Sequence, residues 1–270
     1  MRFYSDHIDY FVELHQSKKE LPYLLMLHGF MGSSRAFDHL INPLNSFCNP
    51  ITIDLAGHGK TDTPSIKGVF ETARQVEQIQ SIIDRLSIEN LFVYGYSMGG
   101  RLLFQLLADN SSLFKGAVVE SSHCGIMDKA TRDDRISIDK KWADSLRNNF
   151  DDFLEEWGKL SLFSSPDDES DKKYRIIMKQ QNPELLALSL EGFGAGVMPP
   201  VCKELQNLDL PLYLVAGEHD KKYASLTPQI SEICNGCEFT IVKHAGHRVH
   251  VDQPEKLLLI IQSFIKANYV

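Results

Sequence analysis

Short apolar runs and longer amphipathic segments alternate along most of the chain, and the two patterns predict different elements. An apolar run bounded by turn residues is typical of a buried strand, whereas apolar residues at every third or fourth position mark one face of a helix. Helices are expected at about Ala36–Leu44 and Glu71–Leu86. Strands are expected in an opening hairpin, Phe3–Tyr4 with Tyr10–Leu14, and at Tyr23–Leu27, Asn49–Leu55, Leu91–Tyr94 and Gly116–Glu120. This order predicts an α/β fold with a mostly parallel sheet flanked by helices.

The stretch from residue 122 to residue 200 breaks this rhythm, because only helix-like patterns occur in it. A stretch of about 80 residues is too long for a bare loop, so we interpret it as an inserted helical cap above the ends of the strands. Strands resume at Pro211–Ala216 and Phe239–Val242, and a last helix is expected at Pro254–Ala267. The predicted organisation is a core formed by residues 1–121 and 201–270, with the cap at 122–200.

The most informative motif in the first part of the core is Gly95-Tyr96-Ser97-Met98-Gly99. It lies between a predicted strand and a run of leucines with helical spacing. A serine in such a turn has a strained backbone, and the flanking glycines leave room where strand and helix crowd together. Strain of this kind costs about 1 to 3 kcal/mol and is found where it aims a reactive group. The same pattern also occurs by chance in loops, but its strand-turn-helix context makes Ser97 a candidate catalytic residue.

A catalytic serine needs a histidine that accepts its proton and a carboxylate that holds this histidine in the correct tautomer. Asp220 ends the turn Gly217-Glu218-His219-Asp220, which follows a predicted strand. Glu120 is a rival, because it also ends a strand. We favour Asp220, since its turn comes just before the segment that carries the candidate histidines.

Three histidines follow the last predicted strand, namely His244, His247 and His250. We favour His247, because it comes after an Ala-Gly pair in the final loop, and we expect the other two to pack locally. The resulting order of serine, aspartate and histidine is the chain order of α/β-hydrolases. Sites of this type also contain an oxyanion hole made of backbone N–H groups, which here would belong to Met98 and Phe30.

Composition and charge limit the possible partners. A chain of 270 residues that is 43% hydrophobic and 24% charged can form one sizeable globular core. The net charge of -8 argues against a nucleic-acid or anionic-membrane partner, because such binding needs a basic face. Met1–His7 lacks the apolar core of a signal peptide, and no apolar run is long enough to span a membrane. We therefore expect a cytoplasmic monomer or weak homodimer that acts on a small molecule.

Five cysteines, an odd number in a long chain, do not suggest a disulfide framework. Cys48, Cys124 and Cys202 each stand alone in the sequence, so we expect them to be unpaired. Cys234 and Cys237 form one C-x-x-C pair, but there is no second pair to complete a zinc site with four ligands. We interpret this pair as incidental.

Five motifs resemble those of the α/β-hydrolase family over nearly the whole chain. They are His28-Gly29-Phe30, Asp54-Leu55-Ala56-Gly57-His58-Gly59, the serine turn, Gly217-Glu218-His219-Asp220 and Gly246-His247. Within this family, the chain is similar to the 2-succinyl-6-hydroxy-2,4-cyclohexadiene-1-carboxylate synthases of the menaquinone pathway. The narrower resemblance lies in Gly95–Arg101, Arg135–Trp142, Trp157–Phe163, Gly192–Gly196 and His247–His250.

The resemblance implies a lyase that eliminates pyruvate from 2-succinyl-5-enolpyruvyl-6-hydroxy-3-cyclohexene-1-carboxylate. It implies a triad that abstracts a ring proton, and neither a cofactor nor a metal. By the same resemblance, the substrate carboxylates are bound by Arg101, Arg135 and Lys179, and the pocket is lined by Tyr96, Trp157 and Phe163. The chain departs from the family at Ala56, where proline is frequent, and at Lys179, where arginine is usual. A lysine presents a point charge instead of a planar fork.

Two other functions stay open on the residues alone. One is a serine esterase or a carbon-carbon bond hydrolase on the same scaffold, and the other is a ligand receptor without catalysis. A complete triad weighs against the receptor. Arg101 and Arg135 weigh against a pocket for neutral esters, because a charged hydrogen bond contributes about 1.5 to 3 kcal/mol. Two such bonds can hold a polycarboxylate substrate despite the unfavourable net charge of the protein.

Overall fold

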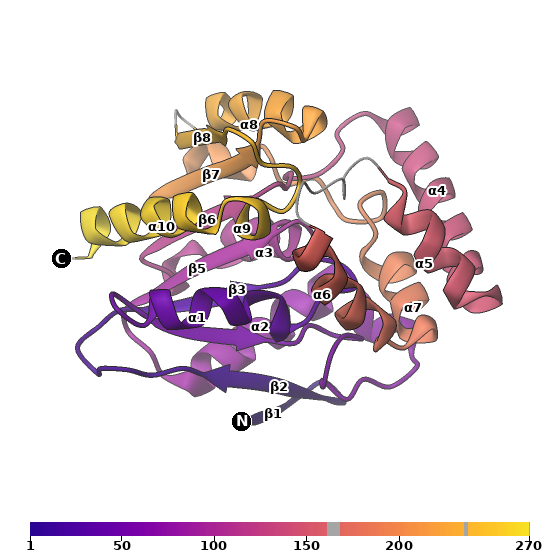
Figure 1. Ribbon diagram of the computed structural model, residues 1–270, viewed down its shortest axis with the longest axis horizontal. Coiled ribbons are helices and arrows are strands. Elements are labelled where there is room, and N and C mark those ends of the chain that lie inside the picture. Colours follow the sequence, from indigo (N-terminus) through magenta and orange to yellow (C-terminus); the bar gives the residue numbers. More distant parts are fainter. Residues whose placement is uncertain (161–167, 235–236, 270) are drawn as a thin grey trace.

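The computed structural model describes residues 1–160, 168–234 and 237–269 of the chain (Figure 1). Its centre is an eight-stranded sheet with the strand order β1-β2-β4-β3-β5-β6-β7-β8. The strands are β1 (Arg2–Ser5), β2 (Ile8–Leu14), β3 (Tyr23–Leu27), β4 (Asn49–Ile53), β5 (Leu91–Tyr96), β6 (Gly116–Glu120), β7 (Leu212–Gly217) and β8 (Glu238–Val242). Every pair from β4 to β8 is parallel, whereas β1 and β2 form the predicted hairpin and β2 pairs antiparallel with β4. The predicted α/β fold is confirmed.

The central strands are buried on both faces, as their continuous apolar sequences predict. All residues of β4, β5 and β6 are buried. Side chains of β3 alternate between the two sides, so that Leu25 and Leu27 belong to one core cluster and Leu24 and Met26 to the other. The sheet therefore has a hydrophobic core on each face.

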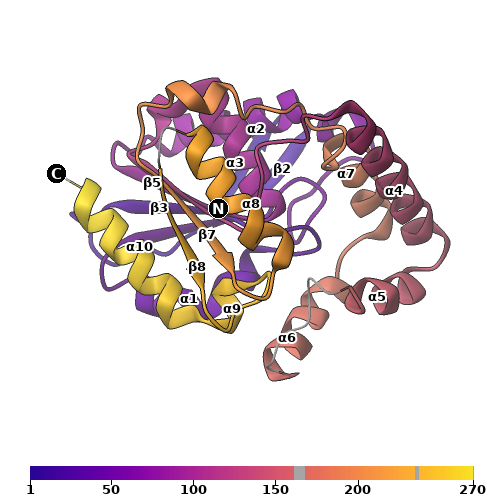
Figure 2. The ribbon, with the colours of Figure 1, turned by 90° about the horizontal axis from the view of Figure 1, so that it is seen from above.

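Helices cover both faces of the sheet, as Figure 2 shows. The helices whose buried residues join the Leu25 cluster are α2 (Thr72–Leu86), α3 (Met98–Asn110) and α8 (Lys221–Ile233). On the Leu24 side lie α1 (Asp38–Leu44), the short α9 (Val249–Asp252) and α10 (Pro254–Asn268). Short 3₁₀ turns are η1 (Ser34–Phe37), η2 (Lys67–Phe70), η3 (Ser111–Leu113) and η5 (Glu204–Asn207).

Among the helices in the described ranges, none combines the length and apolar character needed to cross a membrane.

In the described residues between β6 and β7 there are four α-helices, and Figure 2 shows them gathered at one side of the sheet. They are α4 (Lys129–Asn148), α5 (Phe150–Gly158), α6 (Asp168–Lys179) and α7 (Pro183–Phe193). Three begin at a side-chain cap, because Asp128, Asn149 and Asn182 each accept a hydrogen bond from a backbone N–H of the first turn. These helices occupy the stretch where we predicted the cap, whose limits as a separate domain stay a prediction.

The expectation that Cys124 and Cys202 are unpaired is wrong, because they form a disulfide with an S–S distance of 2.02 Å. Cys124 follows β6 and Cys202 precedes β7, and these strands are neighbours in the sheet. The two ends of the inserted helices are therefore brought together, with 5.0 Å between the Cα atoms of two residues that are 78 positions apart. Cys48, Cys234 and Cys237 are free thiols.

Candidate active site

Ser97 lies at the corner between β5 and α3 with backbone angles of φ 51° and ψ -108°. A positive φ is strained for a residue with a side chain. The corner is tight because α3 packs directly on the end of β3, where a Cβ atom at Gly99 would lie 2.2 Å from the carbonyl oxygen of Leu27. Only glycine fits at this position. The backbone N–H of Ser97 also donates to the carbonyl of Glu120, at 2.9 Å, which ties the corner to β6.

A series of hydrogen bonds connects Ser97, His247 and Asp220. The Oγ atom of Ser97 lies 3.0 Å from Nε2 of His247, and Nδ1 of the same ring lies 2.6 Å from Oδ2 of Asp220. The three residues come from the segments that follow β5, β8 and β7, whose carboxyl ends meet at one edge of the sheet. The arrangement allows the serine proton to pass to His247 while the aspartate fixes the tautomer of the ring.

Asp220 is held in place by the helix that it begins. Its Oδ1 atom accepts a hydrogen bond from the backbone N–H of Tyr223, at 3.4 Å, as the N-cap of α8. The ring of His247 packs against the rings of Tyr96 and Tyr223, with centroid distances of 5.4 and 5.2 Å. Both His247 and Asp220 are only 4% exposed, so little water competes for the hydrogen bond between them.

The rival carboxylate, Glu120, binds a different histidine. Its Oε1 atom lies 2.8 Å from Nδ1 of His250, and its Oε2 atom accepts the hydroxyl of Tyr94. Glu120 and His250 are fully buried, and the ring of His250 contacts that of Tyr96 at 4.5 Å. Burial and the Glu120 charge hold the pKa of Tyr94 well above its usual value. Glu120, His250 and Tyr94 therefore form a buried cluster that contacts the residues of the serine corner from the core side.

A pocket opens at Ser97, and it contains most of the side chains that the sequence predicted. Its lining consists of Phe30, Tyr96, Ser97, Met98, Arg101, His123, Arg135, Trp157, Leu190, Ala195, Lys222, Tyr223 and His247. Phe30 follows β3, and Met98 is the first residue of α3, where backbone N–H groups lack partners within the helix. Both residues are therefore beside Ser97, as an oxyanion hole requires, and their role stays a prediction.

Arg101 and Arg135 bring two guanidinium groups to this pocket. Arg101 is 8% exposed and donates one N–H to the carbonyl of Phe193, at 2.9 Å, while its guanidinium lies 5.1 Å from the centre of the Phe193 ring. Burial and the charge of Arg135 lower the pKa of Arg101 to about 10. Arg135 donates Nε–H to Asp139, at 2.8 Å. Each guanidinium has five N–H donors, so both keep donors for a ligand.

Lys222 is a third cation of the pocket, and the sequence analysis missed it. Within the described ranges no carboxylate forms an ion pair with Lys222, and its ammonium lies 4.9 Å from the centre of the Tyr223 ring. Loss of hydration, followed by repulsion from Arg135 and Arg101, lowers the pKa of Lys222. The only available signal was its place two residues after the candidate Asp220, at the same edge of the sheet.

His123 was missed as well, although it lies three residues after the end of β6. Burial and the charges of Arg101, Lys222 and Arg135 hold its pKa well below the usual value, so the ring is neutral at pH 7. Its Nδ1 atom accepts the backbone N–H of Gly125, at 3.1 Å. In the neutral ring the remaining proton is then on Nε2, which makes this atom a hydrogen-bond donor.

The aromatic and basic residues predicted from the cap differ in their placement. Trp157 lines the pocket, where it stacks on Phe153 at 5.3 Å and meets Phe30 edge-on at 5.5 Å. Lys179 is not part of this pocket and instead lines a separate hollow that also includes Arg248. It is exposed because it comes one residue after Met178, which points into the core from the buried face of α6. Phe163 lies outside the described residues.

A family model for the alpha/beta hydrolase fold matches residues 22–162, and the chain belongs to this class of proteins. A relative from Bacillus subtilis (strain 168), provisionally named 2-succinyl-6-hydroxy-2,4-cyclohexadiene-1-carboxylate synthase, is 34% identical over 248 residues and covers 90% of each chain. The protein therefore belongs to the family of 2-succinyl-6-hydroxy-2,4-cyclohexadiene-1-carboxylate synthases. The family resemblance of the sequence motifs is thereby confirmed.

Two further comparisons agree with this assignment. The synthase of the same name from Citrobacter koseri is 29% identical over 234 residues, which cover 86% of this chain and 89% of that protein. The solved structure of MenH from S. aureus matches with a TM-score of 0.91 and 26% identity, and covers 96% of this chain and 99% of that one. The similarity therefore extends over the core and the inserted helices together.

Glu120→Gln should lower the free energy of unfolding by about 1.5 to 3 kcal/mol, the range for a hydrogen bond to a charged group. The amide cannot accept the hydrogen bonds of both Tyr94 and His250, which converge on the buried carboxylate. Urea denaturation measures the change. Glu204→Gln replaces an exposed carboxylate and is the matched control, which should unfold like the wild-type protein. Equal stability of both variants would show that the Glu120 group contributes nothing to the fold.

Proposed function

We propose that the protein eliminates pyruvate from 2-succinyl-5-enolpyruvyl-6-hydroxy-3-cyclohexene-1-carboxylate, which gives 2-succinyl-6-hydroxy-2,4-cyclohexadiene-1-carboxylate in menaquinone biosynthesis. The observation that carries the proposal is the hydrogen-bonded series of Ser97, His247 and Asp220 in a pocket lined by cations. The names of the Bacillus subtilis and Citrobacter koseri relatives, which refer to this product, support it. Together they favour a lyase on a hydrolase scaffold.

The proposed reaction begins when the triad removes a proton from a ring carbon. His247 accepts the hydroxyl proton of Ser97, and Asp220 stabilises the resulting imidazolium. The electron pair of the broken C–H bond at C2 forms a double bond between C2 and C3, and the pair of the existing C3–C4 double bond shifts to C4–C5 and expels the enolpyruvyl oxygen from C5. A proton returned to the leaving group converts it to pyruvate, so atoms and charge balance without a water molecule. Either Ser97 or His247 can be the immediate base.

The backbone N–H groups of Phe30 and Met98 are the proposed donors for the negative charge that develops during proton removal. They are suited to this task because backbone dipoles fixed by the fold need little reorganisation when the charge appears. Removing one such donor from an enzyme typically slows the reaction by about 10² to 10³-fold. The same donors serve a tetrahedral intermediate in hydrolases, which explains how one scaffold can support both reactions.

Arg101, Arg135 and Lys222 are the proposed binding groups for the substrate carboxylates. The substrate has three carboxylates, and the pocket supplies three cations although the whole chain has a net charge of -8. Loss of hydration lowers the pKa values of Arg101 and Lys222, and repulsion from Arg135 lowers them further. A bound polycarboxylate would remove this repulsion. Lys179 lines a different hollow. In the proposed set of carboxylate-binding residues, Lys222 therefore takes its place.

A serine esterase or carbon-carbon bond hydrolase is the alternative, because it uses the same triad and oxyanion hole. What separates the two is the role of Ser97, which forms a covalent acyl intermediate in a hydrolase. The three cations favour the polycarboxylate lyase over a pocket for neutral esters. We further propose that the protein is cytoplasmic and that it is a monomer or a weak homodimer.

Ser97, Asp220 and His247 should behave as one catalytic unit. Ser97→Ala and His247→Ala should each lower kcat by several orders of magnitude, because the serine and the histidine each need the other to remove the proton. The double variant Ser97→Ala, His247→Ala should be little slower than either single variant. Steady-state kinetics with the precursor measure all three. Multiplicative losses in the double variant would contradict a coupled unit.

Lys222→Gln should lower kcat/KM for the precursor by about 10 to 100-fold, since a charged hydrogen bond contributes about 1.5 to 3 kcal/mol and 1.36 kcal/mol equals tenfold. The effect should appear mainly in KM if the bond is equally strong in the bound substrate and the transition state. Lys221→Gln is the matched control, because Lys221 is exposed, adjacent in sequence and absent from the pocket lining. Equal kinetics of both variants would remove Lys222 from the proposed set.

The direct test follows diene absorbance and free pyruvate during incubation with the precursor. Both should appear together, and neither product should contain oxygen from labelled water, because no hydrolytic step occurs. A deuterium at the abstracted ring position should give a primary isotope effect when proton removal limits the rate. Simple nitrophenyl esters should react poorly, since they lack the carboxylates that supply binding energy. Rapid ester hydrolysis through an acyl-serine, with the precursor untouched, would establish the hydrolase instead.

A further inference from the structure

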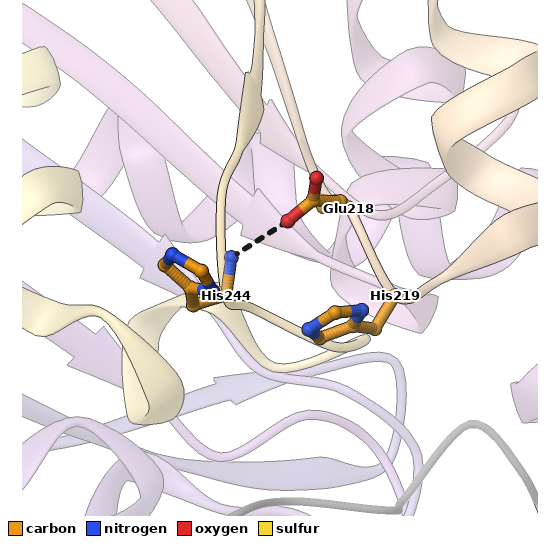
Figure 3. Close-up of side chains that lie close together, drawn as sticks. All are labelled: Glu218, His219 and His244. Carbon is orange, nitrogen blue, oxygen red and sulfur yellow. Dashed lines mark hydrogen bonds between the residues drawn. The ribbon is translucent and has the colours of Figure 1, made fainter.

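Two histidines and a glutamate come together on adjacent turns at the edge of the sheet, outside the proposed catalytic pocket. Figure 3 shows Glu218 and His219 on the turn after β7, and His244 on the turn after β8. One ligand atom from each of these residues lies within 4.8 Å of the other two. Neither the proposed reaction nor the pocket lining uses these side chains. They therefore need a separate explanation.

The backbone that carries the three side chains is firmly held. The N–H of Glu218 donates to the carbonyl of Val242, and the N–H of His219 donates to that of Ala245, both at 2.9 Å. The turns approach so closely that a Cβ atom at Gly217 would lie 2.1 Å from the carbonyl oxygen of Gly246. Only side-chain rotations are then needed to adjust the distances between the ligand atoms.

The Glu218 carboxylate is oriented by a backbone hydrogen bond. The backbone N–H of His244 donates to its Oε2 atom, at 3.1 Å, as the dashed line in Figure 3 marks. One N–H leaves most of the carboxylate lone pairs available, and carboxylates that bind metals are commonly oriented by such bonds.

We propose that Glu218, His219 and His244 form a binding site for a divalent transition-metal cation of the zinc type. Imidazole nitrogen selects zinc, copper and nickel over magnesium or calcium, whose usual ligands are oxygen atoms. Two histidines and one glutamate are a known set of zinc ligands that leaves the fourth position to water. Here His219 and His244 are exposed, so a cation can enter and keep a water ligand.

The geometry needs only a small contraction to fit a cation. Zinc bonds to nitrogen and carboxylate oxygen are about 2.0 to 2.2 Å long, so tetrahedral ligand atoms lie about 3.4 Å apart. From a spacing of at most 4.8 Å, each ligand atom must move inward by less than about 1 Å. Exposed side chains on a rigid backbone can make such a movement by rotation.

Binding at this site would connect the two turns that lead to the proposed catalytic residues. Asp220 follows His219 directly, and His247 is three residues after His244. The cation would not contact the reacting atoms, because the site is separate from the pocket lining. The expected consequence is a higher melting temperature in the presence of the metal, since a ligand that binds only the folded state stabilises it.

Isothermal titration with Zn²⁺ tests the proposal on the full-length chain in a non-chelating buffer. The background variant Cys234→Ser, Cys237→Ser removes the free C-x-x-C thiols, which are competing zinc ligands. A single Zn²⁺ should bind per chain and raise the melting temperature. His219→Ala and His244→Ala should each weaken binding by at least about tenfold, the lower end of the loss seen when only an outer-shell partner is removed.

His7→Asn is the matched control, because His7 is an exposed histidine next to β1, at the opposite edge of the sheet. It should bind Zn²⁺ as tightly as the background protein. Nuclear magnetic resonance of the imidazole nitrogens in the unmutated chain gives a second readout that does not depend on folding of the variants. The resonances of His219 and His244 should shift on titration. Absence of binding, or binding that both alanine variants retain in full, would overturn the proposal.

Discussion

The close packing of α3 on the end of β3 is the constraint on which the site depends. With only hydrogen on Gly99, the helix reaches the carbonyl of Leu27, and the chain must turn sharply at Ser97, where φ is 51°. A hydrogen bond to Glu120 fixes the same corner to β6. These backbone contacts place the serine hydroxyl, and the hydrogen bond to Asp220 places the His247 ring, so that Oγ and Nε2 lie 3.0 Å apart. Precise placement of this kind is what catalysis by proximity requires.

The pocket gathers positively charged side chains in a protein whose net charge is -8. Arg101 is buried and Lys222 has no carboxylate partner within the described ranges, whereas Arg135 is paired with Asp139. Such an arrangement costs stability, because like charges repel and buried charges lose hydration. An anionic ligand would offset both costs by its opposite charge. In the proposed function, affinity and selectivity for polycarboxylates would both arise from this concentration of positive charge.

Most of the fold could be predicted from the sequence, because periodicity and turn residues report local structure directly. Tyr23–Leu27 and Gly116–Glu120 begin and end as predicted. Contacts between distant segments were harder to see. The disulfide of Cys124 and Cys202 depends on β6 and β7 being neighbours, which the sequence does not state. Lys222 was missed for a similar reason, since only the approach of α8 and α4 brings it near Arg135.

The disulfide at the base of the inserted helices has a consequence for how such proteins diversify. Because its two Cα atoms are 5.0 Å apart, the insertion leaves and re-enters the sheet at nearly one point. A segment attached in this way can lengthen, shorten or be exchanged between relatives without altering the strand order beneath it. The inserted helices contribute Arg135, Trp157 and Leu190 to the pocket lining, so substitutions in them can change the shape and charge of the pocket without moving the hydrogen-bonded groups at the sheet edge. The lining of the pocket and the groups at the sheet edge can therefore change in sequence independently of each other.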